Sequence, residues 1–141
     1  MFRDMQPIYI QPESHNHLKH IVCDARGTEE KYASLLDAEL RRATIREKLP
    51  RHVVTPGSIV RYQIDWGAFT PARRLVYPQN FTSEAEQISL LSPIGIALLG
   101  MRRGDTVQIR KADGGFETLH VATVVYPEAV WFDATPSPLP S

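Results

Sequence analysis

Residues 87–105 constrain the fold more tightly than any other part of the chain. The apolar residues of Glu86–Leu91 predict a buried strand. Ser92 suits the position before a helix, because its hydroxyl accepts a hydrogen bond from a free backbone N–H, and Pro93 suits the first helical position, where no N–H is needed. Gly100 is typical of a helix end. This stretch therefore predicts a strand, a short apolar helix and a turn in direct succession.

Apolar residues at helical spacing predict two further helices within Pro12–Ala43, after a short strand at Pro7–Ile10. Leu18, Ile21 and Val22 share one face of the first helix. Gly27 then permits a tight turn. Two short helices joined in this way bury their apolar faces against each other, so we expect an antiparallel helical hairpin.

The remaining chain has the alternating apolar pattern of strands. The predicted strands are Ile59–Ile64, Arg73–Tyr77, Glu86–Leu91, Thr106–Lys111 and Phe116–Val125. Asp113-Gly114-Gly115 is typical of a hairpin turn. The fold class is therefore α+β: a short N-terminal antiparallel helical hairpin, followed by an antiparallel sheet of about five strands whose one face is covered by one short helix.

Composition excludes several classes of protein. The sixteen basic and sixteen acidic residues cancel, and no basic tail or stripe is visible, which argues against independent nucleic-acid binding. Cys23 is the single cysteine, so no intramolecular disulfide is expected. No apolar run is long enough for a membrane span. We expect a monomeric cytoplasmic protein.

Two motifs together carry a family resemblance: Leu75-Val-Tyr-Pro78, and the Ser-Pro-Ile-Gly-x-Ala-Leu-Leu-Gly run that ends at Gly100. They resemble the C-terminal domain of the GreA/GreB transcript-cleavage factors and, within that family, the short regulators of nucleoside diphosphate kinase (the Rnk group). The resemblance implies an FKBP-like domain over residues 49–130, preceded by a short strand and coiled-coil hairpin over residues 1–48. Residues 131–141, rich in proline, are expected to form a disordered tail.

The resemblance also implies a partner, RNA polymerase, contacted near its secondary channel. Gre factors pass carboxylates at the tip of a long coiled coil to the catalytic magnesium of the polymerase. The corresponding carboxylates here are Asp24, Glu29 and Glu30. The two predicted helices, however, span only about 16–22 Å. We therefore expect binding without transcript cleavage, in competition with longer factors, and no catalytic residue, metal or cofactor. In the alternative interpretation, the two glutamates only complement a helix N-terminus, and Asp24 only starts a turn.

By the same resemblance, the contact with the polymerase is made by Ser92, Pro93, Ile94 and Gly95. Helix capping and core packing explain these residues equally well, and both roles can hold together. Three other functions stay open: direct binding to nucleoside diphosphate kinase, an FKBP-like protein-interaction module, and prolyl isomerase activity, which rests on fold analogy alone.

Three residue clusters invite other interpretations. The first is formed by His15, His17, His20 and Cys23. Helical spacing can place two of these side chains on one face, but other candidate ligands lie far away in the sequence, so we expect solvated helix histidines and no metal site. Tyr62, Trp66 and Phe69 are expected to lie in the core or to cover a sheet edge, and not to stack nucleic-acid bases.

The third cluster is a basic run in which arginine and lysine recur over a short stretch. It is expected to be a solvated helix end or, alternatively, a contact for an acidic surface of the polymerase or for RNA. Its members are Arg41, Arg42, Arg46, Lys48 and Arg51.

Overall fold

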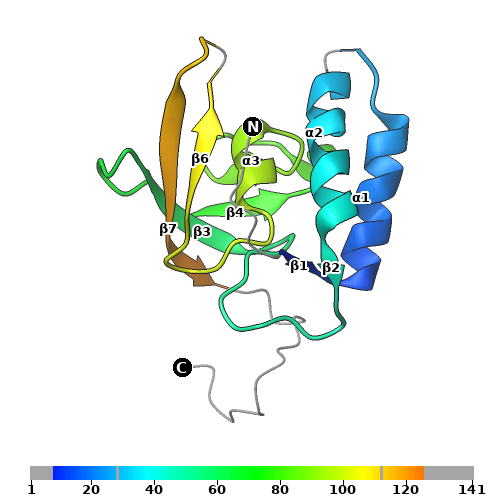
Figure 1. Ribbon diagram of the computed structural model, residues 1–141, viewed down its shortest axis with the longest axis horizontal. Helices are drawn as coiled ribbons and strands as arrows, with labels where there is room; N and C mark the ends of the chain where they lie inside the picture. The colour runs from blue at the N-terminus through cyan, green and yellow to red at the C-terminus, as the bar shows by residue number, and fades with distance from the viewer. Residues whose placement is uncertain (1–7, 28, 112, 126–141) are drawn as a thin grey trace.

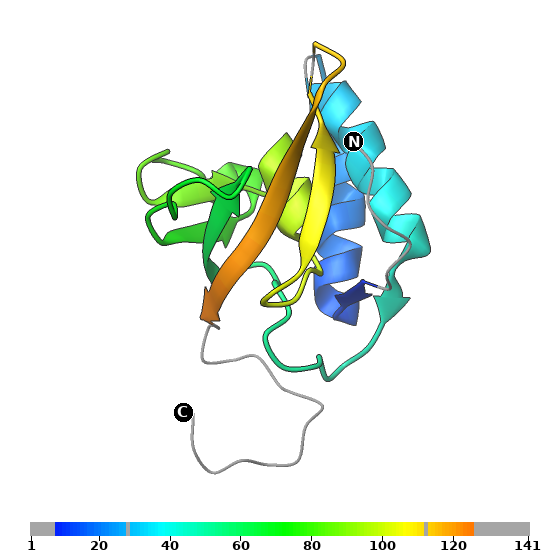
Figure 2. The ribbon, with the colours of Figure 1, turned by 60° about the vertical axis from the view of Figure 1, so that its left-hand side comes forward.

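A computed structural model describes residues 8–27, 29–111 and 113–125, and the expected tail at residues 131–141 lies outside these ranges. The molecule has a twisted sheet on one side, a helical hairpin on the other, and one short helix between them (Figure 1). The view in Figure 2, turned by 60°, shows the same order. The predicted α+β class is confirmed. Within the described ranges, no helix is long and apolar enough to cross a membrane.

The hairpin consists of α1 (Pro12–Asp24) and α2 (Glu29–Arg42), as predicted. Its base is closed by a small parallel sheet of β1 (Tyr9–Ile10) and β2 (Thr44–Ile45), in which Tyr9 pairs with Thr44. Strand β2 is absent from the sequence predictions. It contains two residues, and its pairing partner lies far away in the chain, so no local pattern marks it.

The main sheet has five strands in the order β5-β4-β3-β7-β6. In chain order they are β3 (Ile59–Ile64), β4 (Arg73–Val76), β5 (Gln87–Ser89), β6 (Thr106–Arg110) and β7 (Phe116–Val125). Strand β7 pairs with both β3 and β6, so it forms the centre of the antiparallel part.

The prediction of a wholly antiparallel sheet is wrong at one edge, where β4 and β5 are parallel. The connection between them contains a short 3-10 helix, η1 (Pro78–Asn80), and returns the chain to the end of the sheet at which β4 began. Parallel neighbours need such a crossover, whereas a tight turn would have produced an antiparallel pair.

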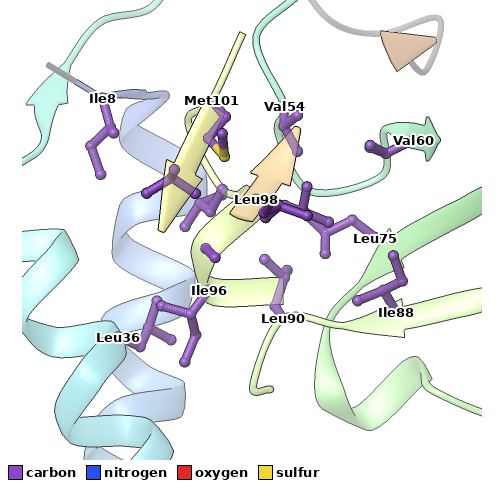
Figure 3. Close-up of a cluster of buried hydrophobic side chains, with 14 of the residues drawn as sticks. Ile8, Leu36, Val54, Val60, Leu75, Ile88, Leu90, Ile96, Leu98 and Met101 are labelled. Atoms are coloured by element: carbon purple, nitrogen blue, oxygen red, sulfur yellow. The ribbon is translucent and has the colours of Figure 1, made fainter. Parts of the chain in front are cut away.

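The short helix α3 (Pro93–Leu98) lies between the sheet and the hairpin and joins them in one core. In Figure 3, Leu36 from α2 lies beside Ile96 from α3, and the cluster continues through Leu90 to Leu75 on β4. All four side chains are fully buried. Burying a side chain of this size contributes about 1.5–3 kcal/mol, so the contact between hairpin and sheet is a substantial part of the fold's stability.

Gly100, just after α3, lets the N-terminal segment pack closely. Its φ of +82° favours glycine, and a Cβ at this position would lie 2.6 Å from the Cβ of Ile8. Ile8 directly precedes β1 and is itself buried. The end of α3 and the base of the hairpin are therefore in direct contact.

Candidate functional site

The N-terminus of α3 forms a corner built from serine side chains. The Oγ of Ser92 accepts a hydrogen bond from the backbone N–H of Gly95 (3.1 Å) and donates one to the carbonyl oxygen of Ser89 (2.7 Å). The Oγ of Ser89 accepts from the N–H of Leu91 (3.1 Å). The predicted N-cap is confirmed, and the same hydroxyl also fixes the helix to the end of β5.

Gly95 determines how closely α3 approaches β5. A Cβ at this position would lie 2.0 Å from the carbonyl oxygen of Ser89, a distance that no side chain can occupy. Gly95 is buried. It therefore shapes the corner from a buried position.

Pro93 supplies most of the exposed surface of the corner. Its side chain is exposed, whereas Ser92 and Ile94 are half-buried. Ile94 packs against the core, and the hydroxyl of Ser92 is committed to the two hydrogen bonds described above. The four residues predicted from sequence therefore lie together, with Pro93 outermost.

The hairpin tip places Asp24, Glu29 and Glu30 in solvent. Glu29 and Glu30 lie in the first turn of α2, where negative charge complements the helix dipole. Among the residues that the structure describes, no three His, Cys, Asp or Glu side chains gather closely enough to hold a metal ion. The tip carboxylates are thus accessible but do not form a metal-binding cluster with one another.

Arg26 stabilises the turn at this tip. Its Nη1 donates hydrogen bonds to the carbonyl oxygens of Ala25 (2.9 Å) and Cys23 (3.2 Å). These carbonyl groups lie at the C-terminal end of α1, where helix carbonyls lack partners within the helix. A basic side chain therefore lies among the acidic residues of the tip.

Comparison with known proteins identifies the family. Residues 49–126 match the family model "Transcription elongation factor, GreA/GreB, C-term". A protein of Escherichia coli K12 named regulator of nucleoside diphosphate kinase is 38% identical over 100 residues, which cover 69% of this chain and 74% of that protein. A Shigella flexneri protein of the same name matches to the same extent. The chain is a member of the GreA/GreB family.

A solved structure supports this assignment for the hairpin as well as for the sheet. The GreA/GreB transcription elongation factor from Nitrosomonas europaea is 31% identical, and its match, with a TM-score of 0.68, covers 86% of this chain and 99% of that one. The resemblance expected from the two sequence motifs, including that to the Rnk group, is confirmed. These GreA/GreB relatives are named as regulators and elongation factors and not as enzymes.

Two of the clustered histidines in this GreA/GreB chain have structural partners. The Nε2 of His15 lies 3.1 Å from the carbonyl oxygen of Leu40 on α2. His17 stacks on Tyr77, with ring centroids 3.9 Å apart, and its Nε2 lies 3.1 Å from the Nε2 of Gln79. The expectation of solvated histidines is wrong for both, because His15 lies on a side of α1 that contacts α2 and His17 on a different side that contacts η1. His20 is exposed.

Of the three aromatic residues singled out in the sequence, Tyr62 on β3 lies in the core as expected, whereas Trp66 and Phe69 are exposed. Tyr62 is buried, and burial raises the pKa of its hydroxyl. Trp66 and Phe69 are 60% and 57% exposed, so neither lies in the core. Trp66 has a φ of +61°, a turn conformation unusual for a bulky residue, and its ring lies 4.6 Å from that of His120.

Proposed function

We propose that this chain binds RNA polymerase near its secondary channel through the corner at Ser92–Gly95 and does not stimulate transcript cleavage. Membership of a family of transcription elongation factors supports the choice of partner. The corner supports the choice of surface, because serine hydrogen bonds and Gly95 hold Pro93 outward at a fixed place. A preorganised corner loses little conformational freedom on binding.

The expected absence of cleavage rests on the length of the hairpin. Helices α1 and α2 contain 13 and 14 residues. At 1.5 Å per residue, each spans only about 20 Å. If the corner docks as in the longer Gre factors, Asp24, Glu29 and Glu30 stop short of the catalytic magnesium. The bound protein then occupies the channel rim and competes with longer factors.

Replacing Pro93 tests the docking surface. The Pro93→Asp substitution places a charge at the exposed apex, and we expect it to weaken binding to core polymerase by at least about tenfold. Pro71 is also exposed and lies outside the corner, so Pro71→Asp is a matched control that should bind normally. Pull-down or surface plasmon resonance measures both. Equal affinities of the two variants would exclude this surface.

A transcript-cleavage assay tests the second half of the proposal. Backtracked elongation complexes incubated with the protein should show cleavage at the intrinsic rate of the polymerase, since no tip carboxylate reaches the active site. Adding a longer cleavage factor should raise the cleavage rate, and an excess of this protein should return it to the intrinsic rate. Strong stimulation by this protein alone would contradict the proposal.

Direct binding to nucleoside diphosphate kinase is the second candidate function. It is favoured by the name of the relatives that are 38% identical. Co-purification with the kinase tests it. A complex with the kinase that forms without polymerase and survives the Pro93→Asp substitution would support this alternative.

A further inference from the structure

Folding brings basic side chains from two distant parts of the chain to the base of the hairpin. Val53 and Arg102 form an antiparallel bridge, and the N–H of Arg103 donates to the carbonyl oxygen of His52 (2.9 Å). His52 has a φ of +60°, which turns the backbone toward this contact. The segment before Val53 and the segment after α3 therefore lie side by side. We call the resulting group the basic surface: Arg46, Lys48, Arg51, Arg102 and Arg103.

Tyr9 holds two members of the basic surface together. The Cζ of Arg46 lies 5.5 Å from the centroid of the Tyr9 ring, and the Cζ of Arg102 lies 5.7 Å from it. Both distances are within the range of cation–π attraction. Pairing of β1 with β2 fixes Tyr9 in turn. The small sheet that the sequence did not predict thus supports the arrangement of these guanidinium groups.

The predicted basic run divides into two groups with different surroundings. Arg41 and Arg42 form ion pairs with Asp37 (2.8 Å) and Glu39 (3.3 Å) along α2. By contrast, among the described residues, Lys48, Arg51 and Arg103 form no ion pair. All three side chains are exposed, as is that of Arg102.

The electrostatic environment of His52 agrees with an excess of positive charge. Burial lowers the pKa of His52 below its ordinary value, and the neighbouring Arg103 and Arg51 lower it further. Glu47 and Asp105 are the carboxylates nearest in sequence to the two segments, against five cationic side chains. A surface with this excess attracts anionic groups.

We propose that the basic surface binds a carboxylate-rich segment of a partner protein, as a contact separate from the corner at Pro93. Arginine side chains can hold carboxylates through two parallel hydrogen bonds. Ile45, 49% exposed, adjoins Arg46 in the chain and adds the apolar contact that protein interfaces use. The proposal holds whichever protein the corner binds.

A protein partner is favoured over a nucleic acid because the whole chain is neutral. Sixteen basic residues are balanced by sixteen acidic ones. Binding to nucleic acid depends on neutralising many phosphates and benefits from net positive charge. A cluster of five cations on a neutral molecule is instead matched by a small acidic patch on another protein, because complementary charges determine specificity at protein interfaces.

Titration of the ¹⁵N-labelled full-length protein with a short oligoglutamate peptide tests the proposal by NMR. We expect shifts in the amide signals of residues 46–52 and 102–103, with affinity that falls as salt rises. Replacing Arg102 and Arg103 together by alanine should lower the affinity about tenfold. The matched control replaces Arg41 and Arg42 by alanine, which removes the same charge from ion-paired positions, and should lower it less than about twofold.

Three outcomes would overturn the proposal. The first is a pattern of shifts centred elsewhere, and the second is an equal loss of affinity in the two double variants. The third is tighter binding of an oligouridylate of matched charge at the same amides, which would assign the surface to nucleic acid. Thermal unfolding of both variants confirms that each remains folded.

Discussion

At residue 95, the absence of a side chain sets the geometry of the corner. Introducing Gly95→Ala would place a Cβ 2.0 Å from the carbonyl oxygen of Ser89. Although alanine is the better helix former, the backbone must shift to relieve this overlap, so we expect a loss of about 2–3 kcal/mol in the free energy of unfolding. Urea titration measures it.

The matched control is Gly67→Ala, in an exposed turn, where the added Cβ would lie 3.2 Å from the carbonyl oxygen of Ile64. This contact needs a shift of only a few tenths of an ångström, so we expect a cost below about 1 kcal/mol. Similar costs for the two substitutions would show that the packing of α3 on β5 tolerates a side chain.

The free energy of unfolding should depend on pH through the titration of His52. Its pKa in the folded protein is lowered by burial and by Arg103 and Arg51, relative to 6.5 in the unfolded chain. Well above pH 6.5 the residue is neutral in both states. As pH falls below this value, the unfolded chain takes up the proton first, so this residue's contribution to stability decreases until the pH passes the folded pKa.

Replacement by asparagine isolates this effect, because asparagine accepts the positive φ of position 52. Between about pH 7.5 and about pH 5.5, the melting temperature of the wild-type protein should fall further than that of His52→Asn. Identical falls in the two proteins would mean that His52 titrates alike in the folded and unfolded states.

Among the elements, those defined by local patterns were predictable from the sequence. The alternation in Ile59–Ile64 and Phe116–Val125 gave the bounds of β3 and β7, and the Ser92-Pro93 pair gave the start of α3. Each signal lies within the element itself. Strand β5 was also predicted, but its parallel pairing with β4 was not, and the small strand β2 was missed altogether, because both depend on pairing with residues elsewhere in the chain, which no local pattern reveals.

The corner and the basic surface also differ in whether local or distant residues define them. The four corner residues were indicated by the family resemblance, and because they are consecutive their closeness in the structure could be expected. The basic surface was found only in part, because Arg102 and Arg103 join it through a bridge to Val53, some fifty residues earlier in the chain. The exposure of Trp66 was missed, since the positive φ that turns it outward belongs to a residue type that rarely adopts it.

At the scale of the whole molecule, the shared core predicts that hairpin and sheet unfold together. Leu36 lies on α2, is fully buried, and belongs to the cluster that includes α3 and β4 (Figure 3). Replacing it by alanine should cost about 2–5 kcal/mol, through lost burial and the cavity left behind. We expect one unfolding transition, with similar loss of hydrogen-exchange protection in α2 and in β7.

The neighbouring Leu35 is half-buried, so Leu35→Ala should cost less and provides the control. Two separate transitions in Leu36→Ala, or unchanged protection of β7 when α2 loses its own, would indicate that the hairpin is an independent unit.

The packing of α2 on α3 has a further consequence for how far the protein can extend. Because the base of the hairpin is held by the core, the tip at Asp24 and Glu29 lies at a fixed distance from Pro93, set by the number of helical turns. One additional turn in each helix, inserted at the tip, would move the carboxylates outward by about 5.4 Å without altering the core. The length of the hairpin can therefore change independently of the position of Pro93.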